Sequence, residues 1–294
     1  MRPGRIYKES NVSRETWSSK THKFLYYQND SILDMGSIIS IVNQKGGVGK
    51  TTTAVNLSAS IAVAEKRCLL VDCDPQGNAT TSLGVNPLEL NPSIYNLLLG
   101  EHVEGEVILD TEIPMLKLIG ANPDLFGAEV EMFSVKNKEY LLHNIISGFR
   151  YQYDYIFIDC PPSLGFLTLN ALTAADCFLV PLQCEYLAME GLTQLLNTIR
   201  LVKRGLNPSL FILGILLTMF DRRNNLSYQV ADEVRQHLKG SVFHTVIPRN
   251  VSLSEASSFG KPIILYNIRS KGAQTYLELA KEILLRGGSR GAQT

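Results

Sequence analysis

The chain has 294 residues, 45% of them hydrophobic, and its 28 basic side chains balance its 28 acidic ones. This composition suffices for one large α/β core, whereas no apolar run reaches the roughly 18 to 20 residues that cross a bilayer. Because the N-terminus also lacks the apolar segment of a signal peptide, we expect a cytoplasmic protein, and the zero net charge argues neither for nor against a nucleic-acid partner.

Residues 1–34 are polar and show no sustained apolar period, which predicts a disordered N-terminal extension. Met35 directly precedes the first apolar run, so a chain that starts at Met35 is the alternative. We expect one folded domain over residues 35–286 and a flexible glycine-rich tail over residues 287–294.

Residues 38–53 join a β-branched apolar run to a glycine-rich loop that ends in lysine and hydroxyls. This order is typical of a strand, a phosphate loop and a helix start, and a simple glycine turn would not explain the Gly-Lys-Thr ending. Backbone N–H groups in such a loop close around an anion, Lys50 reaches the β and γ phosphates, and Thr51 offers its hydroxyl to Mg²⁺. The predicted nucleotide-binding residues are Gly46, Gly47, Val48, Gly49, Lys50, Thr51 and Thr52.

The loop departs from the usual pattern, because Gln44 occupies the position of the first glycine and a second lysine, Lys45, follows it. It thereby resembles the deviant Walker A motif of the ParA/MinD family of ATPases. The resemblance implies that Lys45 crosses a subunit boundary to the nucleotide of a partner and serves catalysis together with Lys50. Two facing triphosphates would offset both lysines; a solvated loop lysine is the alternative.

A helix is expected over residues 52–65, followed by a strand over residues 68–71 that runs into Asp72 and Asp74. Carboxylates at the carboxyl end of a strand beside a phosphate loop lie where open parallel sheets bind ligands. With alternating side chains, both should point toward Mg²⁺ and the γ-phosphate. Similarity to switch I of the family implies that Asp74 orients the attacking water and Asp72 supports the metal; the alternative is a pair of turn-forming aspartates.

Residues 82–133 are acidic and predict short helices and one strand over residues 116–119. A helix over residues 137–149 then leads to an apolar strand that ends at Asp159, as in a Walker B motif, where the aspartate holds Mg²⁺ through water. The following Pro161 and Pro162 resemble switch II of the family.

Strands are expected over residues 177–182, 210–219 and 242–247, and helices over residues 187–204 and 271–286. The near-continuous apolar strands favour a doubly wound, mostly parallel α/β sheet with helices on both faces, as in P-loop NTPases. Residues 181–185 resemble a segment near the dimer face of the family. The resemblance also implies that Pro248 and Asn250 close the adenine pocket.

Charge is unevenly distributed along the chain. Residues 200–271 carry 11 Lys and Arg against 4 Asp and Glu, whereas residues 72–139 carry 3 against 12. A basic C-terminal half is a weak sign of a partner with a phosphate backbone. Arg223 matches a DNA-binding position of the family, but Ser252 stands where a basic residue is common. The candidate DNA contacts are Arg223, Arg222 and Arg249. Lys261, Arg269 and Lys271 could compensate for the missing basic residue at position 252.

Membrane targeting of the MinD kind is the main rival, since Tyr276, Leu277, Ala280, Ile283 and Leu284 form an apolar stripe near the C-terminus. Glu278 and Glu282 offset the basic residues of that helix, so packing on the core is the favoured interpretation and a membrane partner is not expected. A nucleotide-gated scaffold that positions a protein cargo is a further alternative. The five cysteines are expected to be free core thiols.

Resemblance to Soj-type ParA ATPases extends from residue 35 to residue 286. It implies a Mg²⁺-dependent ATPase that forms an ATP-sandwich homodimer, binds duplex DNA nonspecifically on the nucleoid, and partitions a chromosome or plasmid. A centromere-binding partner of ParB/Spo0J type would accelerate hydrolysis and reset the dimer.

Overall fold

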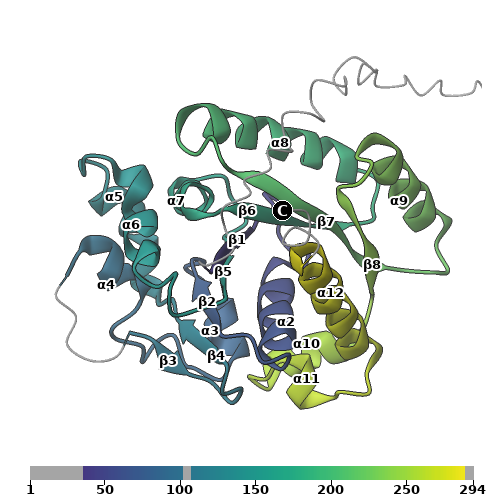
Figure 1. Ribbon diagram of the computed structural model, residues 1–294, viewed down its shortest axis with the longest axis horizontal. Coiled ribbons are helices and arrows are strands. Elements are labelled where there is room, and N and C mark those ends of the chain that lie inside the picture. The colour runs from purple at the N-terminus through teal and green to yellow at the C-terminus, as the bar shows by residue number, and fades with distance from the viewer. Residues whose placement is uncertain (1–35, 102–106, 289–294) are drawn as a thin grey trace, which may run out of the picture.

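One sheet of eight strands forms the centre of the computed structural model, which describes residues 36–101 and 107–288 (Figure 1). Its strand order is β3-β4-β2-β5-β1-β6-β7-β8, and β3 alone among these runs antiparallel to its neighbour. The strands are β1 Ser37–Ile41, β2 Cys68–Asp72, β3 Leu109–Asp110, β4 Leu116–Ile119, β5 Tyr155–Asp159, β6 Cys177–Gln183, β7 Phe211–Phe220 and β8 Val242–Pro248.

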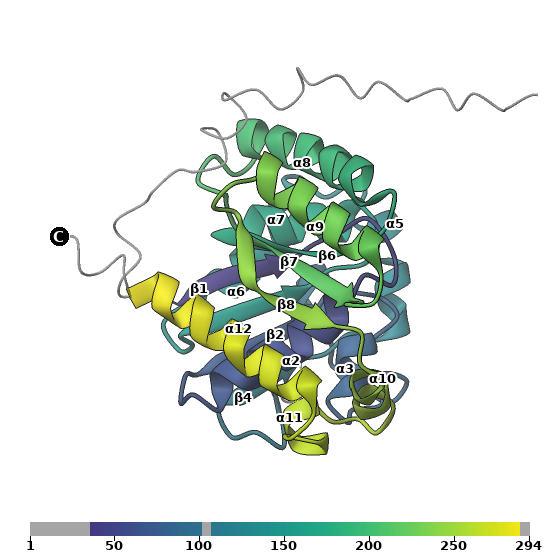
Figure 2. The ribbon, with the colours of Figure 1, turned by 90° about the vertical axis from the view of Figure 1, so that its right-hand side faces the viewer.

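Helices cover both faces of the sheet, as the two views show (Figure 1, Figure 2). One face packs against α4 Ile94–Leu99, the 3₁₀ helix η2 Pro123–Phe126, α5 Ala128–Glu131, α6 Leu141–Ser147, α7 Phe166–Ala174, α8 Ala188–Gly205 and α9 Asn225–His237. The other packs against α2 Lys50–Ala62, α3 Asn78–Ser82, α10 Val251–Ser258, α11 Ile263–Tyr266 and α12 Lys271–Gly288. A short 3₁₀ helix, η3 Lys138–Tyr140, precedes α6. The expected doubly wound α/β fold is confirmed.

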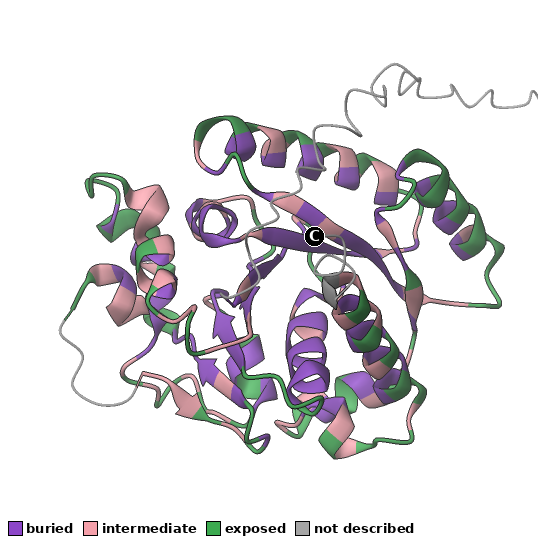
Figure 3. Ribbon diagram, viewed as in Figure 1, coloured by how far each residue is buried: buried purple, intermediate pink, exposed green. Residues whose placement is uncertain are grey.

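Two hydrophobic cores explain why the strands are apolar at nearly every position. Along β1, Ile38 belongs to the core under α7 and α8, whereas Ile39 and Ile41 belong to the core under α2 and α12. A strand buried on both faces needs apolar side chains on both, so alternation is lost and the run is continuous. The central strands are accordingly buried along their length (Figure 3).

The C-terminal helix α12 packs on the protein's own core rather than presenting an apolar face. Tyr276, Ala280 and Ile283 are each at most 3% exposed, and the Tyr276 hydroxyl lies 3.2 Å from the hydroxyl of Thr53 on α2. The stripe seen in the sequence is therefore covered by α2 and β8. Within the part of the chain that the structure describes, no helix is long and apolar enough to span a bilayer.

Element boundaries agree with expectation to within a few residues, with three differences. The helix after the loop ends at Ala62 because the chain turns and reaches a positive φ at Glu65. Residues 137–149 divide into η3 and α6. The strand β3 and the helices α3, α7, α9, α10 and α11 were not expected. The predicted extension over residues 1–34, with Met35, and the tail from residue 289 onward lie outside the described residues.

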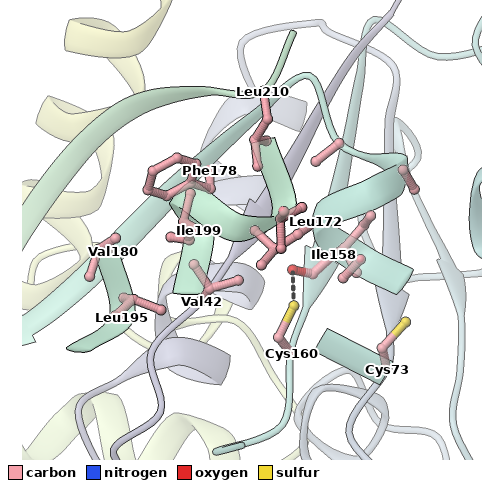
Figure 4. Close-up of a cluster of buried hydrophobic side chains, with 14 of the residues drawn as sticks. Val42, Cys73, Ile158, Cys160, Leu172, Phe178, Val180, Leu195, Ile199 and Leu210 are labelled. Atoms are coloured by element: carbon pink, nitrogen blue, oxygen red, sulfur yellow. Dashed lines mark hydrogen bonds between the residues drawn. The ribbon is translucent and has the colours of Figure 1, made fainter. Parts of the chain in front are cut away.

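All five cysteines are free and buried, as expected. Cys73 and Cys160 directly follow the neighbouring strands β2 and β5 and lie in the core shown in Figure 4. Burial raises the pKa of the Cys73 thiol well above its ordinary value. These thiols therefore fill space as small apolar side chains.

Candidate nucleotide-binding site

The glycine-rich loop between β1 and α2 is held in shape by contacts from other elements. Gly47 and Gly49 have φ angles of 74° and 89°, in the left-handed region where a side chain is strained. The Thr218 hydroxyl at the end of β7 donates to the Val48 carbonyl oxygen at 2.8 Å. Gly49 caps α2, so the loop is a preformed turn at a helix N-terminus, which is a geometry suited to anions.

Lys50, the first residue of α2, lies under this loop with only 6% of its surface exposed. Its ammonium donates to the Lys45 carbonyl oxygen at 3.1 Å. Burial lowers the pKa of Lys50, and the charges of Asp159, Cys160 and Asp74 oppose that effect. Gly46, near the start of the loop, is exposed. Thr51 and Thr52 are half-buried in the first turn of α2.

Asp72 and Asp159 end two neighbouring strands at the same level of the sheet. Asp72 is fully buried, and both of its oxygens are already bonded within its own loop. Oδ1 accepts from the Asp74 N–H at 3.1 Å, and Oδ2 accepts from the N–H and hydroxyl of Thr80 at 2.9 and 2.8 Å. Burial raises the pKa of Asp72, against these hydrogen bonds. Asp72 therefore anchors the turn into α3.

Asp159 is equally buried but differs in its partners. Neither of its carboxylate oxygens accepts a hydrogen bond of good geometry from the described residues. Burial, followed by the charge of Asp72, raises the pKa of Asp159 well above its ordinary value, while the neighbouring Thr51 and Lys50 oppose the rise. A buried carboxylate with both oxygens free to accept is costly unless a cation neutralises it.

Asp74 lies in the loop between β2 and α3 and is 6% exposed. Its Oδ1 accepts from the Gln76 N–H at 3.0 Å, whereas Oδ2 accepts no hydrogen bond from the described residues. The residue lines a cavity that Pro161 and Pro162 also line. The structure thus brings the phosphate loop, Asp72, Asp74 and Asp159 to one edge of the sheet.

Pro248 and Asn250 stand at the same edge, where β8 ends and α10 begins. Pro248 pairs with Phe220 at the end of β7, the strand whose Thr218 holds the loop. The Asn250 side-chain oxygen is buried and has no hydrogen-bond partner among the described residues. A buried acceptor of this kind is suited to a donor on a planar ring, because an unpaired buried acceptor is otherwise destabilising.

Lys45 does not extend freely from the loop. Its ammonium forms an ion pair with Glu185 of the same chain, just beyond the end of β6. The lysine side chain is 50% exposed and that of the glutamate 32%. The next two residues, Tyr186 and Leu187, are apolar and 81% and 58% exposed. This pair was not expected from the sequence.

The three candidate DNA-binding arginines lie together at the ends of β7 and β8, and all are exposed. The Arg249 N–H donates to the Phe220 carbonyl oxygen at 3.2 Å. Arg223 donates through Nε and Nη2 to the two carboxylate oxygens of Asp221, each at 3.1 Å. The positive charge of this cluster is therefore partly offset by one carboxylate.

Sequence reasoning missed the residues that support the site from a distance. Thr218, Thr80 and Glu185 each hold a predicted site residue. Glu185 ends the segment 181–185 that resembles the dimer face of the family, but its ion pair with Lys45 was not predicted. Thr80 could have been found, because it follows Asp72 by eight residues within the short helix α3. The contacts of Thr218 and Glu185 span 170 and 140 positions of the chain.

Comparison with known proteins agrees with this geometry. Residues 36–212 match a family described as an AAA domain. The chain is 57% identical over 252 residues to the chromosome partitioning protein ParA of Myxococcus xanthus, a match that covers 86% of this chain and 89% of that protein. It is 53% identical over 253 residues to the sporulation initiation inhibitor protein Soj of Bacillus subtilis, with coverage of 86% and 100%.

Two solved structures have the same fold and were crystallised with nucleotide. One is described as cobyrinic acid a,c-diamide synthase of Mycobacterium smegmatis with a bound ATP analog and magnesium; its TM-score is 0.76 at 39% identity, over 88% of this chain and 98% of that one. The other is the septum site-determining protein MinD of Pyrococcus horikoshii with Mg-ADP, with a TM-score of 0.72 at 26% identity, over 88% and 100% of the two chains.

Proposed function

The chain belongs to the ParA/Soj family of chromosome-partitioning ATPases, and we propose that it segregates DNA as an ATP-dependent dimer that hydrolysis resets. The observation that carries the proposal is the preformed loop over a buried lysine, with a buried and unpartnered Asp159 beside it. Solved relatives with a bound ATP analog or ADP and magnesium support ATP and Mg²⁺ as the cofactors.

The residues present fit a magnesium nucleotide. The N–H groups from Gly46 to Thr52, Gly49 included, surround the phosphates, and Lys50 pairs with the β and γ phosphates. Thr51 and Asp159 would hold the metal, while Asp72 keeps the second loop in place through its bonds to Thr80. Bound Mg²⁺ supplies positive charge that offsets the phosphate oxygens. The unpartnered oxygens of Asp159 support this assignment.

Asp74 holds and orients the attacking water. Its Oδ2 is free of hydrogen bonds from the described residues, and Oδ1 is fixed by the Gln76 N–H, so the carboxylate is positioned without being occupied. Positioning and electrostatic stabilisation account for most of phosphoryl-transfer catalysis. Pro248 and Asn250 close around the base, and the buried Asn250 oxygen accepts from its exocyclic amino group.

A second copy of the chain covers the face that carries Lys45. In the dimer Lys45 leaves Glu185 and contacts the partner's phosphates, which offset both its charge and that of the partner's Lys50. The exposed apolar side chains of Tyr186 and Leu187 beside the ion pair support an interface at this place, because their burial favours association.

DNA binds to the arginine cluster at the ends of β7 and β8. Arg222, Arg223 and Arg249 from each copy contact phosphates, so that dimerisation multiplies modest contacts into useful affinity. A ParB/Spo0J-type partner stimulates hydrolysis, which separates the copies and releases the DNA. The covered apolar stripe of α12 disfavours membrane attachment of the MinD kind.

Three substitutions test this function. Asp74→Ala should sediment as a dimer with ATP and Mg²⁺ and as a monomer with ADP, because the water is no longer oriented. Lys45→Ala introduced into the same background should still bind a fluorescent ATP analog but stay monomeric, and Lys50→Ala should lose nucleotide binding. A monomeric Asp74→Ala variant at saturating ATP would contradict the proposal.

A further inference from the structure

The short helix α3, which follows the loop that carries Asp74, packs directly against α10, the helix that follows Asn250 (Figure 2). Leu83 at the end of α3 and Ala256 on α10 belong to the same hydrophobic core and are 8% and 1% exposed. This contact joins the segment of the candidate water-orienting carboxylate to the segment of the candidate base-binding residue, although the two lie far apart in the sequence.

A pair of serine hydroxyls connects the two helices. Ser82, the last residue of α3, shares a hydrogen bond with Ser257 on α10, across 175 positions of the chain. Ser82 is only 4% exposed, so loss of this bond leaves a buried hydroxyl without its partner, which is costly. The bond therefore fixes the position of α3 relative to α10.

Two glycines bring the backbones of the same two segments into contact just beyond the helices. Gly84 and Gly260 have φ angles of 84° and 64°, in the left-handed region where a side chain is strained. A Cβ atom on Gly260 would lie 2.9 Å from the Gly84 Cα atom and 3.4 Å from the Thr81 carbonyl oxygen. Because the two backbones lie this close together, a shift of one segment displaces the other.

At its other end, α3 is joined to the loop that carries Asp74. Gly77 directly precedes α3, and its N–H donates to the Asp74 carbonyl oxygen at 2.9 Å. Within α3, Thr80 donates to Asp72 through both its N–H and its hydroxyl. Since α3 is only five residues long, its contacts at both ends act on the same turn of helix, and its place against α10 determines where Asp74 stands.

The helix α10 begins at the position assigned to the base. Asn250 directly precedes its first residue, and the side-chain oxygen of Asn250 is buried without a hydrogen-bond partner among the described residues. Ser257 follows seven residues later, about two turns along the helix. A base amino group that donates to Asn250 thus restrains the helix that holds Ser82 in place.

We propose that Ser82 and Ser257 are positioning residues that make hydrolysis depend on the base of the nucleotide. Adenine seated against Asn250 restrains α10, the serine pair transmits this restraint to α3, and α3 holds Asp74 where it orients water. A triphosphate whose base lacks the amino group binds through the phosphate loop but leaves α10 unrestrained, so it is hydrolysed slowly. The inference rests on the proposed function, because it uses the roles assigned there to Asp74 and Asn250.

Single-turnover hydrolysis by the full chain tests the proposal with two nucleotides, ATP and purine riboside triphosphate, whose base has hydrogen in place of the amino group. The parent protein should hydrolyse ATP at least fivefold faster than the analog. Ser257→Ala should slow ATP hydrolysis about fivefold, the effect of one ordinary hydrogen bond, and leave the dissociation constant of ATP unchanged. Its rate with the analog should equal that of the parent protein. Equal slowing with both nucleotides would show a purely structural role and overturn the proposal.

Further variants serve as controls. Ser82→Ala should match Ser257→Ala, and the double variant should be no slower than either, because both changes remove the same bond. Ser257→Thr keeps the hydroxyl and should retain the parent rate with ATP. Ser254→Ala is the matched control, since Ser254 is exposed on the same helix, and it should behave like the parent protein. Unchanged melting temperatures show that the variants are folded.

The outcomes separate this inference from the proposed function. Equal hydrolysis of both nucleotides by the parent protein, or an unchanged ATP rate in both serine variants, overturns the roles of the two serines and leaves the proposed dimer standing. Asn250→Ala should weaken ATP binding; if it binds ATP as tightly as the parent protein, the proposed base site is wrong. A monomeric Asp74→Ala variant at saturating ATP instead overturns the proposed dimer.

Discussion

Three aspartates at one edge of the sheet have the same side chain and different surroundings. Asp72 is saturated with hydrogen bonds from its own loop and α3, Asp159 accepts none of good geometry from the described residues although Thr51 lies beside it, and Asp74 is bonded through one oxygen only. A saturated carboxylate is structural, an unpartnered one attracts a cation, and a half-bonded one can receive a water. Side-chain environment thus separates roles that the sequence alone assigns by resemblance.

Lys45 shows where sequence patterns stop being informative. Its place in the motif predicts a role at a partner's nucleotide, yet in the single chain it forms an ion pair with Glu185. The pairing depends on how β6 ends beside the loop, and no pattern within either segment encodes that distance. In the proposed dimer, this ion pair would have to break before Lys45 could reach the partner.

Glu185→Gln should strengthen ATP-dependent dimerisation, because Lys45 is then released from its ion pair in the monomer. Partly exposed pairs of this kind are worth up to about 1 kcal/mol each, and one is broken in each copy, which predicts a dimer dissociation constant lower by at most about thirtyfold. Sedimentation equilibrium in the Asp74→Ala background measures it. Glu190→Gln, an exposed change on α8, serves as the control. A weaker dimer would show that Glu185 itself contributes across the interface.

At the level of elements, apolar runs predicted seven of the eight described strands, because strands buried on both faces carry little else. The exception, β3, has two residues and is defined only by its pairing with β4. No local composition can reveal so short an edge strand. The apolar stripe of α12 is compatible in sequence with packing on the core and with membrane binding. In the structure α2 and β8 cover it.

Glu282 fastens α12 to β8. Its carboxylate accepts from the backbone N–H groups of His244 and Thr245, both at 3.0 Å, and from Arg286. Burial pushes the pKa of Glu282 up, but these donors together hold it below its ordinary value. A depressed pKa means that the contribution to stability is complete above the unfolded-state pKa and is lost as pH falls through the folded-state pKa.

Glu282→Gln should therefore lower the free energy of unfolding by about 2 kcal/mol at neutral pH, since charge-assisted hydrogen bonds are removed. The difference from the parent protein should shrink once the pH falls below about 4.3, the ordinary glutamate pKa. Urea titrations at several pH values measure it, with the exposed Glu278→Gln as control. A difference that does not change with pH would contradict the assigned cause.

Across the whole molecule, one edge of the sheet carries both the nucleotide site and the arginine cluster. The carboxyl ends of β1, β2 and β5 supply the phosphate loop and the carboxylates, and those of β7 and β8 supply the arginines. ATP-driven pairing at this edge would bring two arginine clusters into one assembly. Basic residues in the C-terminal half predicted a phosphate-binding surface, but not that Asp221 would lie within it.

Arg249→Ala should reduce the salt dependence of DNA retention by about one unit of slope for each DNA phosphate that is no longer neutralised. Asp221→Asn should act in the opposite direction, because it frees Arg223 from its carboxylate partner. Filter binding of the ATP-bound Asp74→Ala protein at several salt concentrations measures both. Lys66→Ala, which precedes β2 at the other edge of the sheet, should change nothing. If all variants showed the same dependence of DNA retention on salt concentration, the arginine cluster would not be the DNA-binding site.

The C-terminal helix α12 packs on α2, the helix that begins at the phosphate loop. Because α2 begins at the loop and contacts α12 through Thr53 and Tyr276, a movement of α2 on nucleotide binding should also displace α12. A dye coupled near Leu285, which is exposed, should then change its fluorescence when ATP binds.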